Sequence, residues 1–405
     1  MKIIYLHQYF NTPQMPGGTR SFEMARRLVA SGHEVHVITT DRSKPFTRRW
    51  YRTNEHGIQV HWLPVPYKNA MPYRDRIMAF LCYAVHAGLY AGQFEADLVF
   101  ATSTPLTIAL PAIYLAKRRK IPMVFEVRDL WPELPIAVGA IKGPLILPVQ
   151  WLERIAYRNS THIIALSPGM KDGIVRSGYR SDRVHVIPNS ADIEMFSVPE
   201  AEGVSFRKKY DWLQDRPLTV YAGTIGRING VEYLVKLAKK VQSIDSDIRF
   251  LVVGNGREKQ KVITLAKKLN VFEKNFFMIP SLPKKDMPKI LSAANLVISL
   301  FINLPEMWAN SANKFFDGLA SGTTIAINYD GWQAKLLRET GAGIILDSIN
   351  LNLAAYQLTA CIRNPKKLKD SGKAAGRLAT EQFSRDILAK RLEKILSATV
   401  SAAKN

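Results

Sequence analysis

Lys314 and Asp317 are the residues of this sequence whose types and spacing best suit the binding of an anionic ligand. They stand in WANSANKFFDGLASGTTIAIN, residues 308–328, whose pattern predicts a short helix that ends at Gly322 before a buried strand. An ammonium group at a helix start, where the dipole also favours negative charge, is suited to a diphosphate. A carboxylate one turn later can accept hydrogen bonds from two ribose hydroxyls. The alternative for this segment alone is an i, i+3 ion pair between the two side chains.

The neighbours of this pair fit the same interpretation. Ser311 or Asn310 can cap the helix, and Ala312 and Asn313 bring the first backbone amides to its start. Asn313 shares a face with Asp317, because the two residues are four positions apart.

A glycine-rich turn opens the second half of the chain, in YAGTIGRINGVEYLV, residues 221–235. Its glycines let the backbone approach phosphate oxygens, Arg227 adds a cation, and Thr224 lies within the turn. A second turn, VVGNGREK, places Gly254 and Asn255 after another strand. The alternative for the latter is a plain tight turn.

The first half of the chain has a comparable turn in NTPQMPGGTRSF. Gly17 and Gly18 precede a predicted helix start at which a pyrophosphate could bind, and Arg20 adds a cation there. Turns with two glycines are common, and Arg20 has the alternative of an ordinary surface charge.

The segment PMVFEVRDLWPELP, residues 122–135, concentrates charge at the end of a buried strand. Alternation puts Glu126 and Arg128 on one face, and Asp129 falls where the strand passes into a loop. These groups are candidates for catalysis, and the alternative is a structural network of arginine and carboxylates that anchors the loop.

Thirteen apolar segments alternate with helical patterns and predict two parallel sheets covered on both faces. The predicted strands are 2–10, 34–40, 58–65, 97–102, 123–129, 162–167 and 183–189 in the first half, and 218–224, 249–255, 276–281, 296–301, 323–329 and 343–347 in the second. Because ligands of open α/β sheets bind beyond the carboxyl ends of the strands, the loops named above are where a site is expected.

The 405 residues are enough for two cores, and the pattern lapses between the two series of strands. We predict two doubly wound, Rossmann-like domains that face each other across a cleft. The first spans residues 1–190, a linker follows at 191–205, and the second spans 206–383. A last helix, within 384–405, carries an apolar stripe that something must cover.

The net charge of +22 predicts anionic partners. No zinc spacing or nucleic-acid-binding motif accompanies this charge, so an anionic membrane surface is favoured over nucleic acid as the partner. Any one basic cluster can instead be a solvated face.

The apolar stretch at the start of the chain is too short for a secretion signal, and the longest apolar stretch, 77–92, is too short to span a bilayer. With two distant cysteines, Cys82 and Cys361, we expect a cytoplasmic protein with reduced thiols.

Taken together, six stretches resemble glycosyltransferase family 4, in particular bacterial members that build O-antigen and capsular polysaccharides, among them N-acetylfucosamine transferases. The resemblance covers nearly the whole chain and is specific through the order of its motifs. These are YLHQYFNTPQMPGGTRSFEMARRLVASGHEV, FEVRDLWPELP, VIPNSADIEMF, YAGTIGRINGVEYLV, LVVGNGREK and SANKFFDGLASG.

The resemblance implies the GT-B fold, with the acceptor mainly on the first domain, the nucleotide mainly on the second, retention of anomeric configuration, and no metal or other cofactor. It implies that Gly17 and Gly18 approach the donor phosphate and that Asp317 binds ribose. The amides from Ala312 to Lys314 would hold the diphosphate, and Ser281 and Leu282 would flank the base. The terminal helix would cross back to the first domain.

The sequence departs from the family pattern at three places. Arg128 stands where many members have the histidine of a His-Asp pair. Thr224 and Asn229 stand where many have an arginine and a lysine, which leaves Arg227 as a displaced cation. The usual second acidic residue would fall at Ala309, and Glu306 lies three positions early, so that its role is open.

The expected function is therefore a hexosyltransferase that moves a sugar from a UDP-sugar to a glycan or polyprenyl-diphosphate-linked acceptor at the inner face of the cytoplasmic membrane. UDP is favoured over GDP by the resemblance alone. The alternatives are a sugar-nucleotide epimerase on the same scaffold, which would need no acceptor, and a non-catalytic membrane-associated partner.

Overall fold

The computed structural model describes residues 1–15, 17–68, 71–190 and 192–404. The chain divides into two compact units. Unit 1 comprises Met1–Thr12, Gly18–Pro188 and Asp386–Asn405, and unit 2 comprises Pro13–Gly17 and Asn189–Arg385.

Unit 1 contains an eight-stranded sheet in the order β3-β4-β2-β1-β5-β6-β7-β8, parallel except for β3. Its strands are β1 (Lys2–Leu6), β2 (Glu34–Asp41), β3 (Tyr51–Glu55), β4 (Ile58–Pro64), β5 (Leu98–Thr102), β6 (Met123–Val127), β7 (His162–Ala165) and β8 (Val184–Val186). The order of the strands reverses between β1 and β5, which is the point where open α/β sheets bind ligands.

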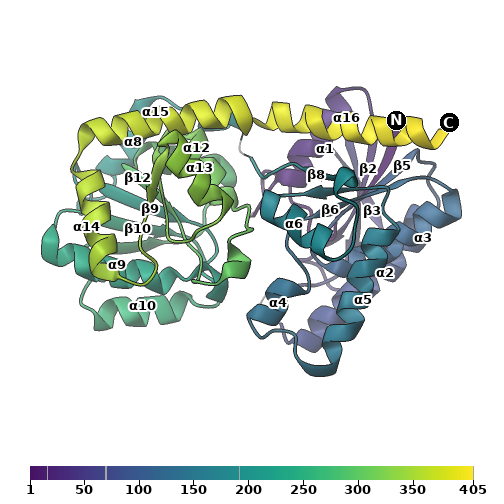
Figure 1. The fold of residues 1–405 in the computed structure, drawn as a ribbon, viewed down its shortest axis with the longest axis horizontal. Coiled ribbons are helices and arrows are strands. Elements are labelled where there is room, and N and C mark those ends of the chain that lie inside the picture. The colour runs from purple at the N-terminus through teal and green to yellow at the C-terminus, as the bar shows by residue number, and fades with distance from the viewer. Residues whose placement is uncertain (16, 69–70, 191, 405) are drawn as a thin grey trace. The chain divides into compact units, whose positions relative to one another are not determined.

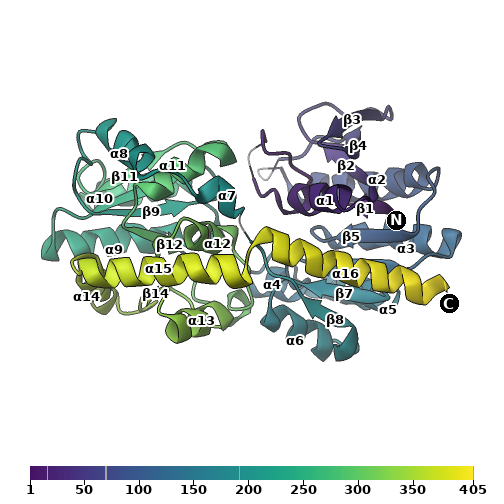
Figure 2. The same cartoon turned by 90° about the horizontal axis from the view of Figure 1, so that it is seen from above.

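Helices cover both faces of this sheet, with α1 and α16 on one face and α2, α3 and α5 on the other (Figures 1 and 2). The helices of unit 1 are α1 (Arg20–Ala30), α2 (Tyr73–Ala91), α3 (Ala109–Arg119), α4 (Glu133–Ala137), α5 (Ile146–Arg158), α6 (Pro168–Arg176) and α16 (Arg385–Lys404), with the short 3-10 turns η1 (Leu106–Ile108), η2 (Gly143–Leu145) and η3 (Ser181–Arg183).

The C-terminal helix α16 packs within unit 1. Leu388, Leu392 and Leu396 of its predicted stripe are fully buried. Asp386 pairs with Arg27 of α1 at 2.6 Å, and Glu393 accepts from His33 at 3.1 Å. The last residues of the chain thus complete the unit that the first residues begin.

Unit 2 contains a six-stranded parallel sheet in the order β11-β10-β9-β12-β13-β14, and its strand order reverses between β9 and β12. Its strands are β9 (Leu218–Ala222), β10 (Arg249–Val253), β11 (Phe276–Ile279), β12 (Leu296–Ser299), β13 (Thr324–Ile327) and β14 (Gly343–Ile345).

Helices α9 and α10 lie on one side of the unit 2 sheet, and α12 and α15 lie on the other (Figure 1). The helices of unit 2 are α7 (Ile193–Phe196), α8 (Glu200–Lys208), α9 (Val231–Ile244), α10 (Lys259–Lys268), α11 (Met287–Ser292), α12 (Asn313–Ala320), α13 (Trp332–Thr340), α14 (Leu351–Ile362) and α15 (Pro365–Gln382), with the 3-10 turns η4 (Arg227–Asn229), η5 (Lys284–Asp286) and η6 (Pro305–Met307).

The prediction of two doubly wound parallel sheets is confirmed, and all thirteen predicted strands are present. Most of them end two or more residues earlier than predicted, because buried residues such as Phe10 continue the apolar pattern after the ladder has ended. Of the predicted linker 191–205, Ala191 lies outside the described residues, and helices α7 and α8 occupy much of the rest.

Neither cysteine is in a disulfide, and Cys361 is buried while Cys82 is partly exposed. In the described part of the chain, no helix combines the length and the apolar character needed to cross a membrane.

Candidate functional site

Helix α12 begins without a side-chain cap, after the segment that follows β12 and contains η6. Its N-cap residue is Ala312, and no side-chain hydrogen bond caps it. The proposed cap Ser311 is wrong, because its Oγ accepts from the backbone N–H of Asn189 at 3.0 Å. Asn310 accepts only from the N–H of Ala312 itself, at 3.2 Å. The amides of the first turn, at Asn313 and Lys314, are thus not capped by either proposed side chain.

Lys314 connects the start of α12 with the glycine turn that follows β9. Its Nζ donates to Oδ1 of Asn229 at 3.0 Å and lies 4.5 Å from the ring centre of Phe301 and 5.1 Å from that of Tyr221. No carboxylate of the described chain lies within ion-pair distance of this ammonium group. Burial lowers the pKa of Lys314 to about 7. The site therefore contains a basic group, the amine of Lys314, that has no carboxylate partner among the described residues.

Asp317 lies one turn further along α12 and does not pair with Lys314, so the simple i, i+3 ion pair is wrong. Its Oδ2 instead forms a short contact with Nζ of Lys284, and both side chains are largely buried. Lys284 also lies 5.1 Å from the ring centre of Phe196. The other carboxylate oxygen, Oδ1, is buried without a hydrogen-bond partner. Asp317 therefore has one oxygen held in place and one able to accept.

The other residues considered for unit 2 lie exposed in loops and short turns. Ser281 and Leu282 are exposed in the loop after β11, which leads into Lys284. Thr224 is exposed in the glycine turn. Glu306 is exposed in η6, away from any ion pair.

Gly254 and Asn255 support the glycine turn itself. A Cβ at Gly254 would clash with the carbonyl oxygen of Gly223, and the carbonyl of Asn255 accepts from the N–H of Ile225 at 2.9 Å. The close approach of the Gly223 backbone thus gives Gly254 a structural reason that involves no ligand. A role in ligand binding stays a prediction for both residues.

Arg227 is exposed and lines a separate hollow of about 400 Å³ beside the same turn. Lys236, Glu258 and Ser348 also line it, whereas Lys314 and Asp317 do not. The cation nearest to the helix start is thus Lys314 rather than Arg227.

In unit 1, Arg20 and Glu126 form a buried ion pair, which favours the structural alternative for Glu126. Nε and Nη2 of Arg20 donate to Oε1 of Glu126 at 3.0 and 2.8 Å, and its remaining donors bind the carbonyls of Ile187 and Pro188. Burial disfavours the ionised Glu126, but Arg20 and Arg128 outweigh it and keep its pKa low. Arg20 is consequently neither a surface charge nor available to a pyrophosphate.

Arg128 and Asp129 follow β6 at the carboxyl edge of the sheet. The N–H of Arg128 donates to Oγ of Ser103, which follows β5, at 3.0 Å. Burial raises the pKa of Asp129 to about 6, although the charge of Arg128 opposes this. Asp129 can thus change its protonation state near neutral pH.

His7, directly after β1, completes this group and was not singled out by the sequence. Nη1 of Arg128 lies 3.5 Å from its Nε2, and its Nδ1 is buried without a partner. Burial and the charges of Arg128 and Arg42 hold its pKa well below the usual range, so the ring is neutral. If Nε2 accepts from Arg128, Nδ1 carries the proton and can donate to an oxygen of a ligand. No signal in the sequence marks this position, because the predicted strand 2–10 contains His7, whereas β1 ends at Leu6.

Gly17 and Gly18 precede α1 as predicted. Gly17 has a positive φ of 124°, and the carbonyl of Gly18 accepts from Nδ2 of Asn11 at 3.2 Å. Contact with a phosphate stays a prediction for both. No group of three or more His, Cys, Asp or Glu side chains suited to a metal occurs among the described residues.

Both halves of the chain match models of sugar-transferring enzymes. Residues 17–190 match the glycosyl transferase 4-like domain, and residues 205–378 match the glycosyl transferases group 1 domain. One relative is the Escherichia coli protein named "Putative colanic acid biosynthesis glycosyl transferase WcaI", which is 23% identical over 286 residues, or 67% of this chain and 70% of the relative.

Solved structures share the fold over the whole chain. Sucrose-phosphate synthase from Thermosynechococcus elongatus has a TM-score of 0.80 at 14% identity and is covered over 99% of both chains. HepE of Anabaena, solved in complex with UDP and glucose, has a TM-score of 0.75 at 15% identity, over 98% of this chain and 100% of that one. These neighbours confirm the GT-B fold. Since the two domain models together account for most of its length, the chain belongs to the glycosyltransferases, with a 4-like domain followed by a group 1 domain.

Proposed function

We propose that this chain is a retaining, metal-independent hexosyltransferase that uses a UDP-sugar and serves surface polysaccharide synthesis, such as that of O-antigen or capsule. The observation that carries the proposal is the pair of unfilled groups on α12. The unpaired ammonium of Lys314 suits a diphosphate, and the open Oδ1 of Asp317 suits a ribose hydroxyl. The UDP complex of HepE and the name of WcaI support the choice of nucleotide and pathway.

In this proposal unit 2 holds the donor and stabilises the leaving group. The bond between the anomeric carbon and the diphosphate oxygen breaks as negative charge develops on the diphosphate. Lys314 and the uncapped amides at the start of α12 stabilise that charge before and during departure. The acceptor hydroxyl forms the new bond on the same face of the sugar, and its proton passes to the departing diphosphate.

Unit 1 holds the acceptor, which we propose to be a glycan or a polyprenyl-diphosphate-linked sugar at the inner face of the cytoplasmic membrane. Asp129 accepts a hydrogen bond from a hydroxyl of the acceptor or of the donor sugar. His7 donates through Nδ1 to a neighbouring oxygen and takes part of the role of the family histidine that Arg128 replaces. An acetamido-deoxyhexose is the proposed class of donor sugar, on the family resemblance alone.

The test is a screen of UDP- and GDP-sugars for release of the nucleoside diphosphate, with and without a lipid-linked acceptor. Release that depends on the acceptor, with retained configuration in the product by NMR, is the expected result. Rearrangement of the donor without acceptor would identify an epimerase, and inverted product would overturn the proposed stereochemistry.

Asp317→Asn is expected to raise the Kd for UDP by about 10- to 100-fold, because a hydrogen bond to a charged group contributes about 1.5–3 kcal/mol. The amide also loses the charge that holds Lys284 in place. Isothermal titration calorimetry measures the change, and Asp286→Asn on neighbouring η5 is the matched control. Equal affinity of both variants and the wild-type protein would remove Asp317 from the ribose site.

Below pH of about 6, kcat/KM is expected to fall with decreasing pH, because protonation of Asp129 removes the acceptor of its hydrogen bond. Since burial raises the pKa of Asp129, this loss begins well above the usual range for aspartate. In Asp129→Asn the acid limb should disappear and activity should fall by at least about 100-fold at pH 7.5. A pH–rate profile that is identical in the variant would assign the limb to another group.

A further inference from the structure

Helix α2 buries Tyr83 and otherwise small residues, and it exposes a series of large apolar residues. Its buried residues are Ala79, Tyr83, Ala84, Ala87, Gly88 and Ala91. Its exposed residues Tyr73, Ile77, Leu81, Val85 and Leu89 are between 42% and 62% accessible. Because they recur at every fourth position, they form one stripe along the helix. Large side chains in water beside small ones in the core indicate a surface made to contact something else.

The stripe continues onto the adjoining helices α3 and α5, which lie on the same face of the sheet (Figure 1). Leu110 and Tyr114 of α3 border an apolar hollow of about 260 Å³ that they share with the α2 stripe. On α5, Leu147 and Trp151 are 73% and 62% exposed. We call the exposed apolar residues of α2, α3 and α5 the apolar face of unit 1.

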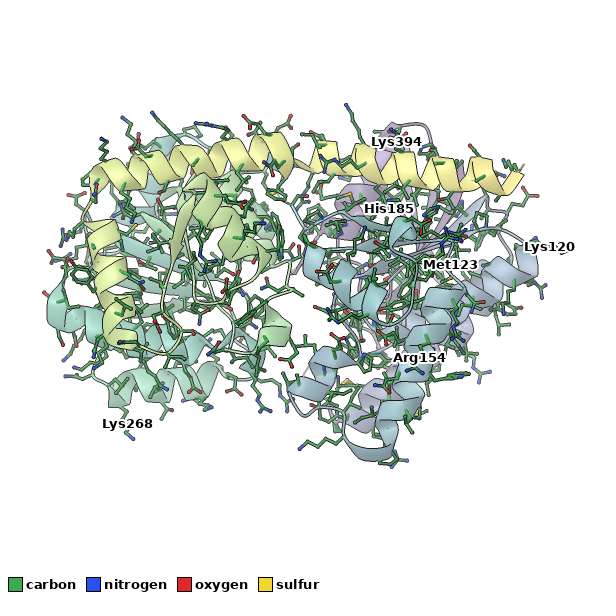
Figure 3. All side chains as sticks on the ribbon, in the orientation of Figure 1. Lys120, Met123, Arg154, His185, Lys268 and Lys394 are labelled. Carbon is green, nitrogen blue, oxygen red and sulfur yellow. The ribbon has the colours of Figure 1, made fainter. Side chains whose placement is uncertain are left out.

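Cations border this apolar face. At one edge the loop before β3 brings Phe46 against His86 of α2, with ring centres 5.8 Å apart, and carries the exposed Arg48 and Arg49. At another, α3 ends in the exposed run 117–120, which is KRRK. Figure 3 labels Lys120 at the end of this run and Arg154 on α5, and both are exposed.

Carboxylates are scarce on the same helices. Helix α2 carries Asp75 alone, α3 carries none, and the one acid of α5, Glu153, is buried. Exposed apolar side chains within a rim of cations are complementary to a bilayer with anionic headgroups. The acyl chains accept the apolar side chains, and the lipid phosphates attract the cations.

We infer that the apolar face of unit 1 docks on an anionic lipid bilayer and inserts its α2 stripe among the acyl chains. This deepens the membrane location given under the proposed function, but it does not depend on sugar transfer. The hollow between α2 and α3 offers room for part of one lipid chain. A protein with a net charge of +22 could also adhere to an anionic membrane through its charge alone, and any part of its surface could then make the contact. Insertion of the α2 stripe distinguishes the inferred mode from such adhesion.

The experiment compares full-length variants in cosedimentation with vesicles of phosphatidylcholine, with and without phosphatidylglycerol. Val85→Ser/Leu89→Ser removes two members of the stripe, which are 61% and 62% exposed. Leu353→Ser/Tyr356→Ser on α14 of unit 2, at 43% and 67% exposure, is the matched control. Circular dichroism and thermal unfolding verify that both variants fold.

The α2 variant should bind vesicles that contain phosphatidylglycerol at least about tenfold more weakly than the wild-type protein, and the control should bind as the wild type does. Equal loss in both variants, no loss in either, or binding that ignores phosphatidylglycerol would overturn the inference. UDP binding is measured on the same samples without vesicles. Failure of UDP to bind the wild-type protein would count against the proposed function and leave the docking result unaffected.

Discussion

Lys314→Met is expected to lower kcat at least about 100-fold while leaving unit 2 folded. Removal of one group that stabilises developing charge typically costs 10²–10³ in rate. Methionine keeps an unbranched apolar side chain of nearly the same length beside the rings of Tyr221 and Phe301, but it cannot neutralise a diphosphate. Since the wild-type ammonium has no carboxylate partner among the described residues, its loss should not reduce the melting temperature.

Release of UDP from the donor, measured at saturating substrate, checks the effect on kcat. Lys268→Met on α10, an exposed lysine, is the matched control and should retain full activity. Turnover within about threefold of the wild type in Lys314→Met would exclude this residue from leaving-group stabilisation and return attention to Arg227.

The same variant has a second readout in proton uptake. With its pKa lowered to about 7, most Lys314 is neutral at pH 8 in the free protein, and a bound diphosphate restores its charge. UDP binding to the wild-type protein should therefore take up protons between pH 7 and the ordinary lysine pKa of about 10.4. Calorimetry in two buffers with different ionisation enthalpies measures this uptake, which Lys314→Met should abolish.

Glu126→Gln should lower the free energy of unfolding of unit 1 by about 3–5 kcal/mol, because it leaves the buried guanidinium of Arg20 without its counter-ion. The side chains of the pair are only 3% and 0% exposed, so water cannot replace the lost partner. Glutamine keeps the shape of the carboxylate and thereby isolates the charge. Urea denaturation followed by tryptophan fluorescence measures the change.

Glu95→Gln is the matched control, because it breaks an ion pair of similar length at the surface. Glu95 lies 3.0 Å from Lys2, with side-chain exposures of 81% and 46%. Because water screens this exposed pair, its loss should leave the free energy of unfolding almost unchanged. Equal effects of the two substitutions would mean that Arg20 finds water or another acceptor, and that Glu126 is free for a role in the site.

The fold was largely predictable from the sequence because each buried parallel strand is a continuous apolar run between turn residues. The strand that was missed, β3, reads YRTNE and has no such run, because it is an antiparallel edge strand with one side in water. Its pairing depends on a turn at His56 and Gly57, both with positive φ, and on Tyr51 lying opposite Trp62. Edge strands carry little burial signal, so local patterns miss them.

The sequence predicted the residues of the candidate site that stand in a loop or helix start soon after a strand. It did not predict which side chains contact one another when they come from different loops. Lys314 and Asp317 were recognised from one helix start, but the partner of each lies far away in the sequence. Lys284 and Asn229 stand 33 and 85 residues from the groups they contact. The ion pair of Arg20 could not be predicted from local patterns either. Its partner Glu126 is 106 residues away, and the two residues meet only because the fold brings the start of α1 close to β6.

The return of α16 to unit 1 has a consequence for biosynthesis. A ribosome makes the parts of unit 1 that lie within residues 1–188 before most of unit 2, but the twenty-residue helix that buries Leu388, Leu392 and Leu396 against them emerges only after unit 2. Domains usually fold in the order of their synthesis. Here the unit that is begun first is finished last, after unit 2 has been translated in full. Until then the apolar surface of unit 1 that α16 covers is exposed to solvent and to chaperones. Synthesis interrupted before α16 would therefore leave unit 2 complete and unit 1 incomplete.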